Sequence, residues 1–247
     1  PPFFKRIYRP CVIYFVRQNA TDILSTPKAA FSLFHKSFWQ KDKRYQVIYN
    51  GLDTKQFTGV ATNLRAELNI PSNAFVVGHT GRFNQAKNHK TILQVAERLL
   101  TKHKDIYFIL CGNGVQTNLN QAPEWERFKQ RILLFENRTD IPQFLNTMDC
   151  YFFPSTREGQ PNALIEAMLV GLPYVASNIS PIVETVPSPE SLYPPTDVIA
   201  FVEAIEKIYL KSKQQSAGTA RMIYQGVEQR FDADTQFGQF YSVLVSK

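Results

Sequence analysis

The stretch CYFFPSTREGQPNALIEAMLVGLPYVAS, residues 150–177, decides the fold. Its first part, CYFFPS, is an apolar and aromatic run typical of a strand buried on both faces, and TREGQP is rich in turn formers. A helix follows, with Asn162 as the expected N-cap, Gly171 at the left-handed C-terminal position and Pro173 to end it. PYVAS is the next strand. The stretch therefore predicts a βαβ unit of a parallel sheet.

Glu166 is the unusual residue of this helix, because its helical neighbours are apolar and such a helix is buried nearly all round. A carboxylate there is costly unless it faces a ligand or a structural partner, and both interpretations stay open. Glu158 lies in the loop just before the helix. Both carboxylates can therefore reach the crevice at the carboxyl ends of the strands, where open α/β sheets bind ligands.

Glu158 and Glu166, with seven residues between them, closely resemble the glutamate-seven-glutamate motif of glycosyltransferase family 4, retaining enzymes of the GT-B fold. The similarity includes Pro154-Ser155 in the preceding strand, Glu-Ala-Met in the helix and Val175-Ala176-Ser177 in the next strand. It is dense between residues 76 and 186. The resemblance implies that Glu158 holds hydroxyls of a donor sugar and Glu166 those of a ribose.

The segment after Glu158 departs from the family pattern, because many relatives have Gly-Phe-Gly there and this chain has Gly-Gln-Pro-Asn. Pro161 has no N–H group, so the amides of Asn162 and Ala163 are expected to cradle negative charge on the donor. Gly159 is expected to bind the donor as well. The departure leaves the choice of donor sugar open.

A second motif with chemical character is GRFNQAKNHK, which follows the predicted strand FVVGHT. Gly81 lets the backbone turn at the strand end, and Arg82 and Lys87 project into the same crevice as Glu158. A guanidinium and an ammonium beside a helix N-terminus form a diphosphate site without a metal. The alternative is a pair of ordinary surface cations. The spacing resembles the Gly-Arg and Lys of the family, which grip the diphosphate of the donor.

The turn CGNGVQ, which contains Gly112 and Gly114, resembles the Gly-x-Gly turn of the family. A dinucleotide-binding fingerprint needs a third glycine, whose place Thr117 takes, so a nicotinamide oxidoreductase is disfavoured. The two glycines either allow close backbone approach to the nucleotide or simply form a strand-to-helix turn. Backbone groups near Phe135 and Glu136 resemble the family segment that lines the base of the donor.

Strands and helices alternate from residue 75 onward, which predicts right-handed βαβ units and a Rossmann-like, doubly wound parallel sheet. FGQFYSVLVS is predicted to be the last helix. A strand is also expected over 45–53 and a short helix over 63–68. The other expected helices cover residues 88–103, 116–130, 141–147, 163–170, 196–212 and 215–230.

Residues 1–44 resemble the last helix, strand and helix of the N-terminal acceptor domain of a GT-B enzyme, with the helix interrupted near Pro10. Residues 45–247 correspond to the domain that binds the nucleotide sugar, with a C-terminal crossover helix. The main body of the acceptor domain is missing from the sequence. We therefore expect this chain alone to bind its donor and to transfer nothing.

The net charge of +7 comes entirely from residues 1–44, which hold nine basic and two acidic side chains. A basic, aromatic segment at one end fits an anionic membrane surface better than nucleic acid, which usually needs a basic face across the binding domain. A solvated charged helix is the alternative. Without a run of eighteen apolar residues or a signal peptide, the chain is expected in the cytoplasm, peripheral to the inner face of the cell membrane.

No cofactor or protein-held metal is expected. Cys11, Cys111 and Cys150 lie far apart and are predicted to be small buried residues, and the four histidines lack ligand spacing. Asp232 and Asp234 form an Asp-x-Asp pair, a pattern that holds a divalent metal in GT-A transferases. Here it opens the predicted last helix instead of following a strand, so capping is favoured.

The resemblance implies a retaining transferase that moves a hexose or N-acetylhexosamine from a nucleoside diphosphate sugar, with UDP favoured over GDP or ADP, to a lipid-linked glycan. EGQPNALIEAM and the N-terminal segment resemble bacterial O-antigen and capsule enzymes. Arg82, Lys87 and Glu158 are the expected catalytic residues. Two other classes stay open: a non-catalytic nucleotide-sugar binding module, and a GT-B-type sugar-nucleotide epimerase that acts on the donor without an acceptor.

Overall fold

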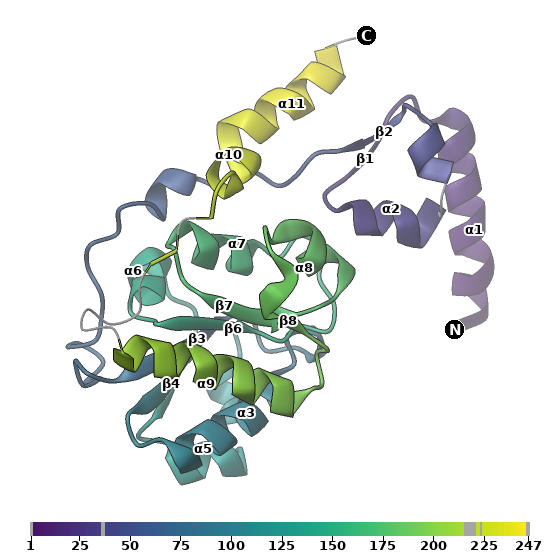
Figure 1. The fold of residues 1–247 in the computed structure, drawn as a ribbon. Helices are drawn as coiled ribbons and strands as arrows, with labels where there is room; N and C mark the ends of the chain where they lie inside the picture. Colours follow the sequence, from purple (N-terminus) through teal and green to yellow (C-terminus); the bar gives the residue numbers. More distant parts are fainter. Residues whose placement is uncertain (1, 36–37, 215–220, 223, 246–247) are drawn as a thin grey trace.

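A six-stranded parallel sheet in the order β5-β4-β3-β6-β7-β8 forms the centre of the computed structural model, which describes residues 2–35, 38–214, 221–222 and 224–245 (Figure 1). Within this sheet, the first strand in the chain is β3, at the centre, followed by β4 and β5 toward one edge. The chain then crosses over to β6, beside β3, and continues through β7 and β8 to the other edge. This order confirms the predicted Rossmann-like, doubly wound α/β fold. The strands are β3 (Phe75–Thr80), β4 (Ile106–Cys111), β5 (Ile132–Phe135), β6 (Cys150–Phe153), β7 (Tyr174–Ser177) and β8 (Leu192–Tyr193).

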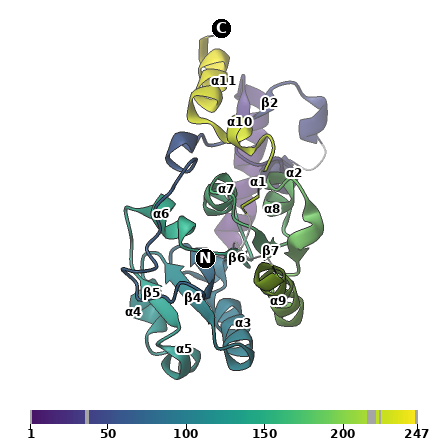
Figure 2. The same ribbon diagram turned by 60° about the vertical axis from the view of Figure 1, so that its left-hand side comes forward.

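Helices cover both faces of the sheet, as Figures 1 and 2 show. One face carries α3 (His89–Lys102), α4 (Val115–Leu119), α5 (Pro123–Phe128) and α9 (Val198–Gln214). The other face carries α6 (Ile141–Asn146), α7 (Asn162–Leu169), α8 (Ser180–Thr185) and α10 (Val227–Phe231). Alternate residues of a strand point to opposite faces, so each strand contributes to two apolar cores.

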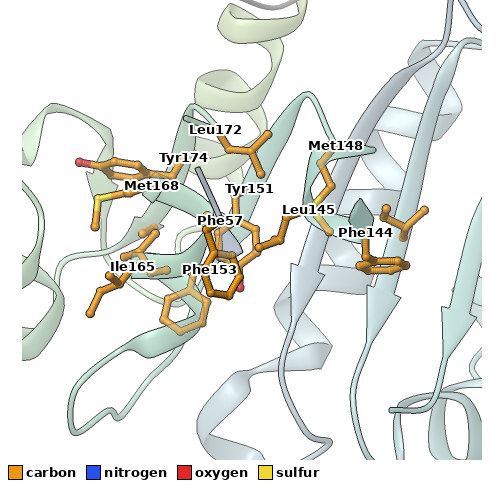
Figure 3. Close-up of a cluster of buried hydrophobic side chains, with 14 of the residues drawn as sticks. Phe57, Phe144, Leu145, Met148, Tyr151, Phe153, Ile165, Met168, Leu172 and Tyr174 are labelled. Atoms are coloured by element: carbon orange, nitrogen blue, oxygen red, sulfur yellow. The ribbon is translucent and has the colours of Figure 1, made fainter. Parts of the chain in front are cut away.

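The core under α6 and α7 supports the carboxyl ends of β3 and β6 (Figure 3). Tyr151 and Phe153 of β6 are fully buried, and Phe153 stacks near Tyr151 with ring centroids 5.9 Å apart. The Tyr151 hydroxyl lies 2.8 Å from the Thr80 hydroxyl at the end of β3. The two central strands are therefore held together where the sheet order reverses.

Residues 2–35 and 38–47 form a small separate unit beside this body (Figure 1). It contains α1 (Pro2–Asn19) and the parallel pair β1 (Ile23–Ser25) and β2 (Tyr45–Val47), connected by α2 (Lys28–His35) and the 3-10 turn η1 (Phe38–Lys41). Glu184 of α8 accepts hydrogen bonds from the amides of Lys28 and Ala29 at the start of α2. This contact fixes the unit to the sheet body.

Several predicted boundaries were wrong. The helix α1 continues through Pro10, because one proline removes one helical hydrogen bond without having to end the helix. Strand β2 ends at Val47, and residues 63–68 are not helical: a turn covers residues 65–69 instead. The predicted helix 116–130 is split into α4 and α5, because Pro123 is accommodated at the start of a helix and not in its interior.

The C-terminal region also differs in detail. Residues 215–220 and 223 of the predicted helix 215–230 lie outside the described residues, and within the described part only α10 is helical. The last helix, α11 (Ala233–Val245), begins at the Asp-x-Asp pair, and Asp232 caps it by accepting a 2.9 Å hydrogen bond from the Thr235 amide, which confirms the predicted capping role. Cys11 is exposed and not buried as predicted. None of the described helices combines the length and the apolar composition that a membrane crossing requires.

Gly112 allows the loops after β3 and β4 to pack closely against each other. Its φ is +154°, and a Cβ atom there would collide with the carbonyl group of Gly81 and lie 2.8 Å from the Arg82 nitrogen. The Gly81 amide also donates a 2.8 Å hydrogen bond to the Cys111 carbonyl. The glycine therefore permits a close approach between two backbones.

Gly112→Ala should lower the free energy of unfolding by about 2 kcal/mol or more, because the clash is with backbone and cannot be relieved by a rotamer change. Urea denaturation measures this change. Gly238→Ala, in α11 with no atom within 4 Å of the added Cβ, is the matched control and should be neutral or stabilising by about 0.5–1 kcal/mol. Equal stability of the two variants would contradict the proposed constraint.

Candidate active site

A cavity of about 560 Å3 lies at the carboxyl ends of β3 and β6. This is the edge of the sheet where the strand order reverses, the usual ligand-binding position in such sheets. Seven of the residues predicted from the sequence line it, and four lining residues were not predicted. The lining consists of Arg82, Asn84, Ala86, Lys87, Arg157, Glu158, Gly159, Gln160, Asn162, Ala163 and Glu166.

Lys87 is fixed in this cavity by three contacts. It ends the 3-10 turn η3 (Gln85–Lys87), where its amide donates a 3.0 Å hydrogen bond to the Asn84 side chain. Its Nζ atom lies 2.7 Å from Oε1 of Glu158 and 4.6 Å from the centre of the Phe153 ring. The side chains of this ion pair are only 15% and 10% exposed, so their attraction is less screened than that of a surface pair.

Glu166 points into the site from α7 without a protein partner, since no residue in the described ranges forms a hydrogen bond or ion pair with its carboxylate. Burial raises its pKa from the ordinary 4.5 to about 7, while the charge of Lys87 acts in the opposite direction. The structural interpretation of Glu166 required a cation or hydroxyl to hold it. The structure supplies none among its described side chains, which favours the ligand interpretation.

The start of α7 differs from the prediction. Pro161 is the N-cap and Asn162 is the first helical residue, so Asn162 is not the cap. The Asn162 amide donates to the Gln160 carbonyl at 3.0 Å, whereas the Ala163 amide has no bond to any described residue. The Oδ1 atom of Asn162 is also buried without a partner within the described chain. Of the two amides expected to cradle charge, Ala163 is the available one.

The other predicted donor-binding residues do not line this cavity. Gly114 has φ +76° and caps α4, so it forms the strand-to-helix turn. The Glu136 carboxylate accepts hydrogen bonds from the amides of Gly114 and Thr117, at 2.6 and 3.0 Å, so it too caps α4. These bonds lower the pKa of Glu136. The Phe135 carbonyl accepts from the Gly112 amide at 3.1 Å. Contact of these residues with a nucleotide base stays a prediction.

Sequence reasoning missed Gln160 and Arg157. Gln160 joins the loop to the linker, because its side chain accepts from the Asn50 amide at 2.7 Å and donates to the Asn50 carbonyl at 2.8 Å. Arg157 is exposed and lines the cavity. The departure from the family pattern at Gln160 was visible in the sequence, but nothing in the sequence indicates that this side chain meets Asn50.

The charge balance of the cavity favours an anion. Arg82, Lys87 and Arg157 are cationic, whereas Glu158 is paired with Lys87, and the raised pKa of Glu166, about 7, leaves its carboxylate only partly ionised near pH 7. Within the part of the chain that is described, no group of three or more His, Cys, Asp or Glu side chains is arranged to hold a metal ion. The arrangement suits a diphosphate, held by cations and a helix N-terminus.

Glu166→Gln should stabilise the protein in a pH-dependent manner. The folded state holds the Glu166 proton more tightly than the unfolded state, so the free energy of unfolding falls as pH rises between 4.5 and about 7. The glutamine side chain does not titrate, so the variant lacks this loss. Its free energy of unfolding minus that of wild type should therefore be larger at pH 8 than at pH 4, by up to roughly 3 kcal/mol. Urea denaturation at both pH values measures the difference.

Glu203→Gln, at an exposed position on α9, is the matched control and should show the same difference from wild type at both pH values. If Glu166→Gln behaves like this control, Glu166 is solvated and its carboxylate is not poised for a ligand.

The chain is similar to known proteins over part of its length. The chain is 28% identical over 135 residues to the O-antigen biosynthesis glycosyltransferase WclY of Escherichia coli, covering 54% of this chain and 37% of that protein. It is 30% identical over 159 residues to the UDP-Gal:alpha-D-GlcNAc-diphosphoundecaprenol alpha-1,3-galactosyltransferase of Escherichia coli, covering 59% and 39%. The chain thus spans less than half the length of these relatives.

Among solved structures, HepE of Anabaena in complex with UDP and glucose has the same fold, with a TM-score of 0.81 and 24% identity. The match covers 97% of this chain and 67% of that one. The model of the family described as glycosyl transferases group 1 matches residues 60–226, which include both loops of the cavity. That match spans more than half of the sequence, and the chain belongs to the group 1 glycosyl transferases.

Proposed function

We propose that this chain is the donor-binding part of a retaining family 4 glycosyltransferase that transfers a sugar from a UDP-sugar to a lipid-linked glycan. The observation that carries this proposal is the single cavity that contains Arg82, Lys87, Glu158, Glu166 and the start of α7. The names of relatives, which refer to O-antigen and capsule synthesis, support a place in bacterial surface-polysaccharide synthesis. UDP in the HepE structure supports the choice of base.

The diphosphate of the donor would compete with Glu158 for Lys87. The two side chains neutralise each other, and each stays in place because the other holds it. An incoming diphosphate attracts the ammonium group, and Arg82 adds a second cation from the same loop. Glu158 is then free to accept hydrogen bonds from sugar hydroxyls. Charge that grows on the leaving diphosphate meets groups already positioned for it, which lowers the barrier selectively.

Glu166 would bind the ribose. A ribose offers two neighbouring hydroxyl donors, and a partly buried carboxylate without a protein partner is compensated when it accepts from them. Burial raises the pKa of Glu166 to about 7, and hydrogen bonds from the ribose hydroxyls would favour its ionised form. Glu166 thereby discriminates in favour of a nucleoside over free diphosphate.

The reaction needs no protein nucleophile in this scheme. The bond between the anomeric carbon and the diphosphate oxygen breaks, and the acceptor hydroxyl forms its bond to that carbon on the same face. The hydroxyl proton passes to the leaving diphosphate. Retention of configuration follows from attack on the face that the diphosphate leaves.

A cytoplasmic location beside the membrane completes the proposal. Tyr8, Tyr14 and Phe15 of α1 are about two-thirds exposed or more, in the segment that carries the whole excess of positive charge. Exposed aromatic rings together with basic side chains suit the headgroup region of an anionic bilayer. This would bring the transferase to an acceptor that is anchored in lipid.

Arg82→Ala and Lys87→Ala should each weaken UDP binding by about 1.5–3 kcal/mol, the usual loss for a hydrogen bond to a charged group. Uridine binding should barely change, because the nucleoside lacks the diphosphate. Isothermal titration calorimetry with both ligands measures this. Arg98→Ala, an exposed arginine on α3 outside the cavity, is the control and should bind both as wild type does. Equal losses for UDP and uridine would sink the diphosphate assignment.

UDP affinity should also be the same with EDTA and with added Mn²⁺, because the cationic side chains take the place of a metal ion. Calorimetry of the same protein in the two buffers checks this. A strong requirement for the metal would show that the Lys87 and Arg82 assignment is incomplete.

A further inference from the structure

His79 is a buried imidazole near Lys87 that the proposed function does not use. It belongs to β3 and is fully buried. Its ring stacks with those of Tyr151 and Phe153, whose centroids lie 6.4 and 5.8 Å away. Its Nε2 atom has no hydrogen-bond partner among the described residues. A phenylalanine ring would stack in the same place without leaving a buried nitrogen unbonded, so packing alone does not account for the imidazole.

A backbone carbonyl fixes the tautomer of His79. The Phe152 carbonyl oxygen lies 3.0 Å from Nδ1 and can only accept, so Nδ1 carries the proton and donates it. Burial, followed by repulsion from His89 and Lys87, holds the pKa of His79 well below its ordinary value of 6.5, which keeps the ring neutral. Nε2 therefore carries a lone pair and is the negative end of the imidazole dipole.

The Nε2 atom meets the stem of Lys87 at Gly81. A Cβ atom at Gly81 would lie 3.0 Å from Nε2 of His79, 3.1 Å from Cε of Lys87 and 3.2 Å from its Cδ. The imidazole and the end of the lysine stem thus approach the same point, which stays open because Gly81 has no side chain. From this position the Lys87 ammonium group lies over the Phe153 ring and pairs with Glu158.

The contact between the lone pair and the charged end of the lysine is attractive. In a buried environment, the negative end of a fixed dipole stabilises a cation more strongly than it would in water. A lysine side chain has many rotamers, and Glu158 and Phe153 hold only the ammonium end of Lys87. His79 holds the stem, and the ammonium charge then acts on both Glu158 and Glu166.

We propose that His79 is a positioning residue of the donor site, whose neutral imidazole holds the stem of Lys87 so that the ammonium group is directed at the diphosphate of the donor. This rests on the proposed function, which makes Lys87 a diphosphate ligand. His79 itself touches no substrate. When the diphosphate takes the place of Glu158, the stem stays against His79 and only the ammonium end has to move.

A double-mutant cycle on UDP affinity, measured by calorimetry, separates this role from a structural one. His79→Phe keeps an aromatic ring and removes the lone pair, and it should weaken UDP binding by roughly fivefold, the net effect of one interaction as strong as a hydrogen bond. Uridine binding should not change. Lys87→Met keeps the length of the stem and removes the charge. In that background, His79→Phe should have no further effect on UDP affinity.

Tyr151→Phe is the matched control, because it removes a buried polar atom from the same ring stack and leaves the contact between His79 and Lys87 in place. It should bind UDP as wild type does. The proposal is overturned if His79→Phe binds UDP like wild type. It is also overturned if His79→Phe loses as much affinity in the Lys87→Met background as in the wild-type protein, since the effect would then not act through the lysine.

A second measurement needs no ligand and no change at His79. The nitrogen NMR signal of Nε2 in the 247-residue chain should differ between wild type and Lys87→Met, because the lone pair loses its neighbouring charge. Lys104→Met, at an exposed position, should leave the signal in place. A signal that is the same in Lys87→Met and wild type would overturn the proposal even if His79→Phe fails to fold.

The two measurements also separate this proposal from the proposed function. If Lys87→Met alone leaves UDP affinity unchanged, the assignment of Lys87 to the diphosphate is rejected. The nitrogen signal of His79 then still decides whether the imidazole holds the lysine, because it does not depend on UDP.

Discussion

The ion pair between Lys87 and Glu158 is the interaction on which the site depends, because it connects the loops that follow the two central strands. Strands β3 and β6 are neighbours in the sheet, at the position where the strand order reverses, but they are not consecutive in the chain. Their loops are therefore far apart in sequence. The pair closes the gap with an ammonium and a carboxylate that are both largely withdrawn from water. Burial makes this attraction stronger than at a surface, and it also makes removal of one partner costly. A ligand anion that takes the place of the Glu158 carboxylate beside Lys87 therefore binds between loops that are already in position.

The sequence was sufficient to predict the fold class and the seven residues that gather in the cavity. Strong signals made this possible: apolar runs buried on both faces, turn formers between them, and a lone glutamate in an apolar helix. Glu166 is the clearest case, because its unusual surroundings could be seen from its neighbours alone. Its raised pKa and lack of a described partner agree with that expectation.

Contacts between distant segments could not be predicted in the same way. Glu136 has the right type and place to line a base, but its carboxylate is used to cap α4, a role that depends on how β5 and α4 meet in space. The split between α4 and α5 and the continuity of α1 both concern proline. The sequence analysis expected Pro10 to interrupt a helix and Pro123 to lie inside one, whereas α1 continues through Pro10 and α5 begins at Pro123.

The bonds from Gln160 to Asn50 have a consequence for how the molecule moves. Both backbone groups of Asn50 are held by one side chain of the loop that carries Glu158, and the neighbouring Leu52 forms a bridge with Asp232 before α11. The linker between the small N-terminal unit and the sheet body is thus tied to the cavity wall. The Asn50 amide can exchange its hydrogen with solvent only when its hydrogen bond to the Gln160 side chain breaks. Its hydrogen-exchange rate therefore reports how often the cavity loop and the linker separate.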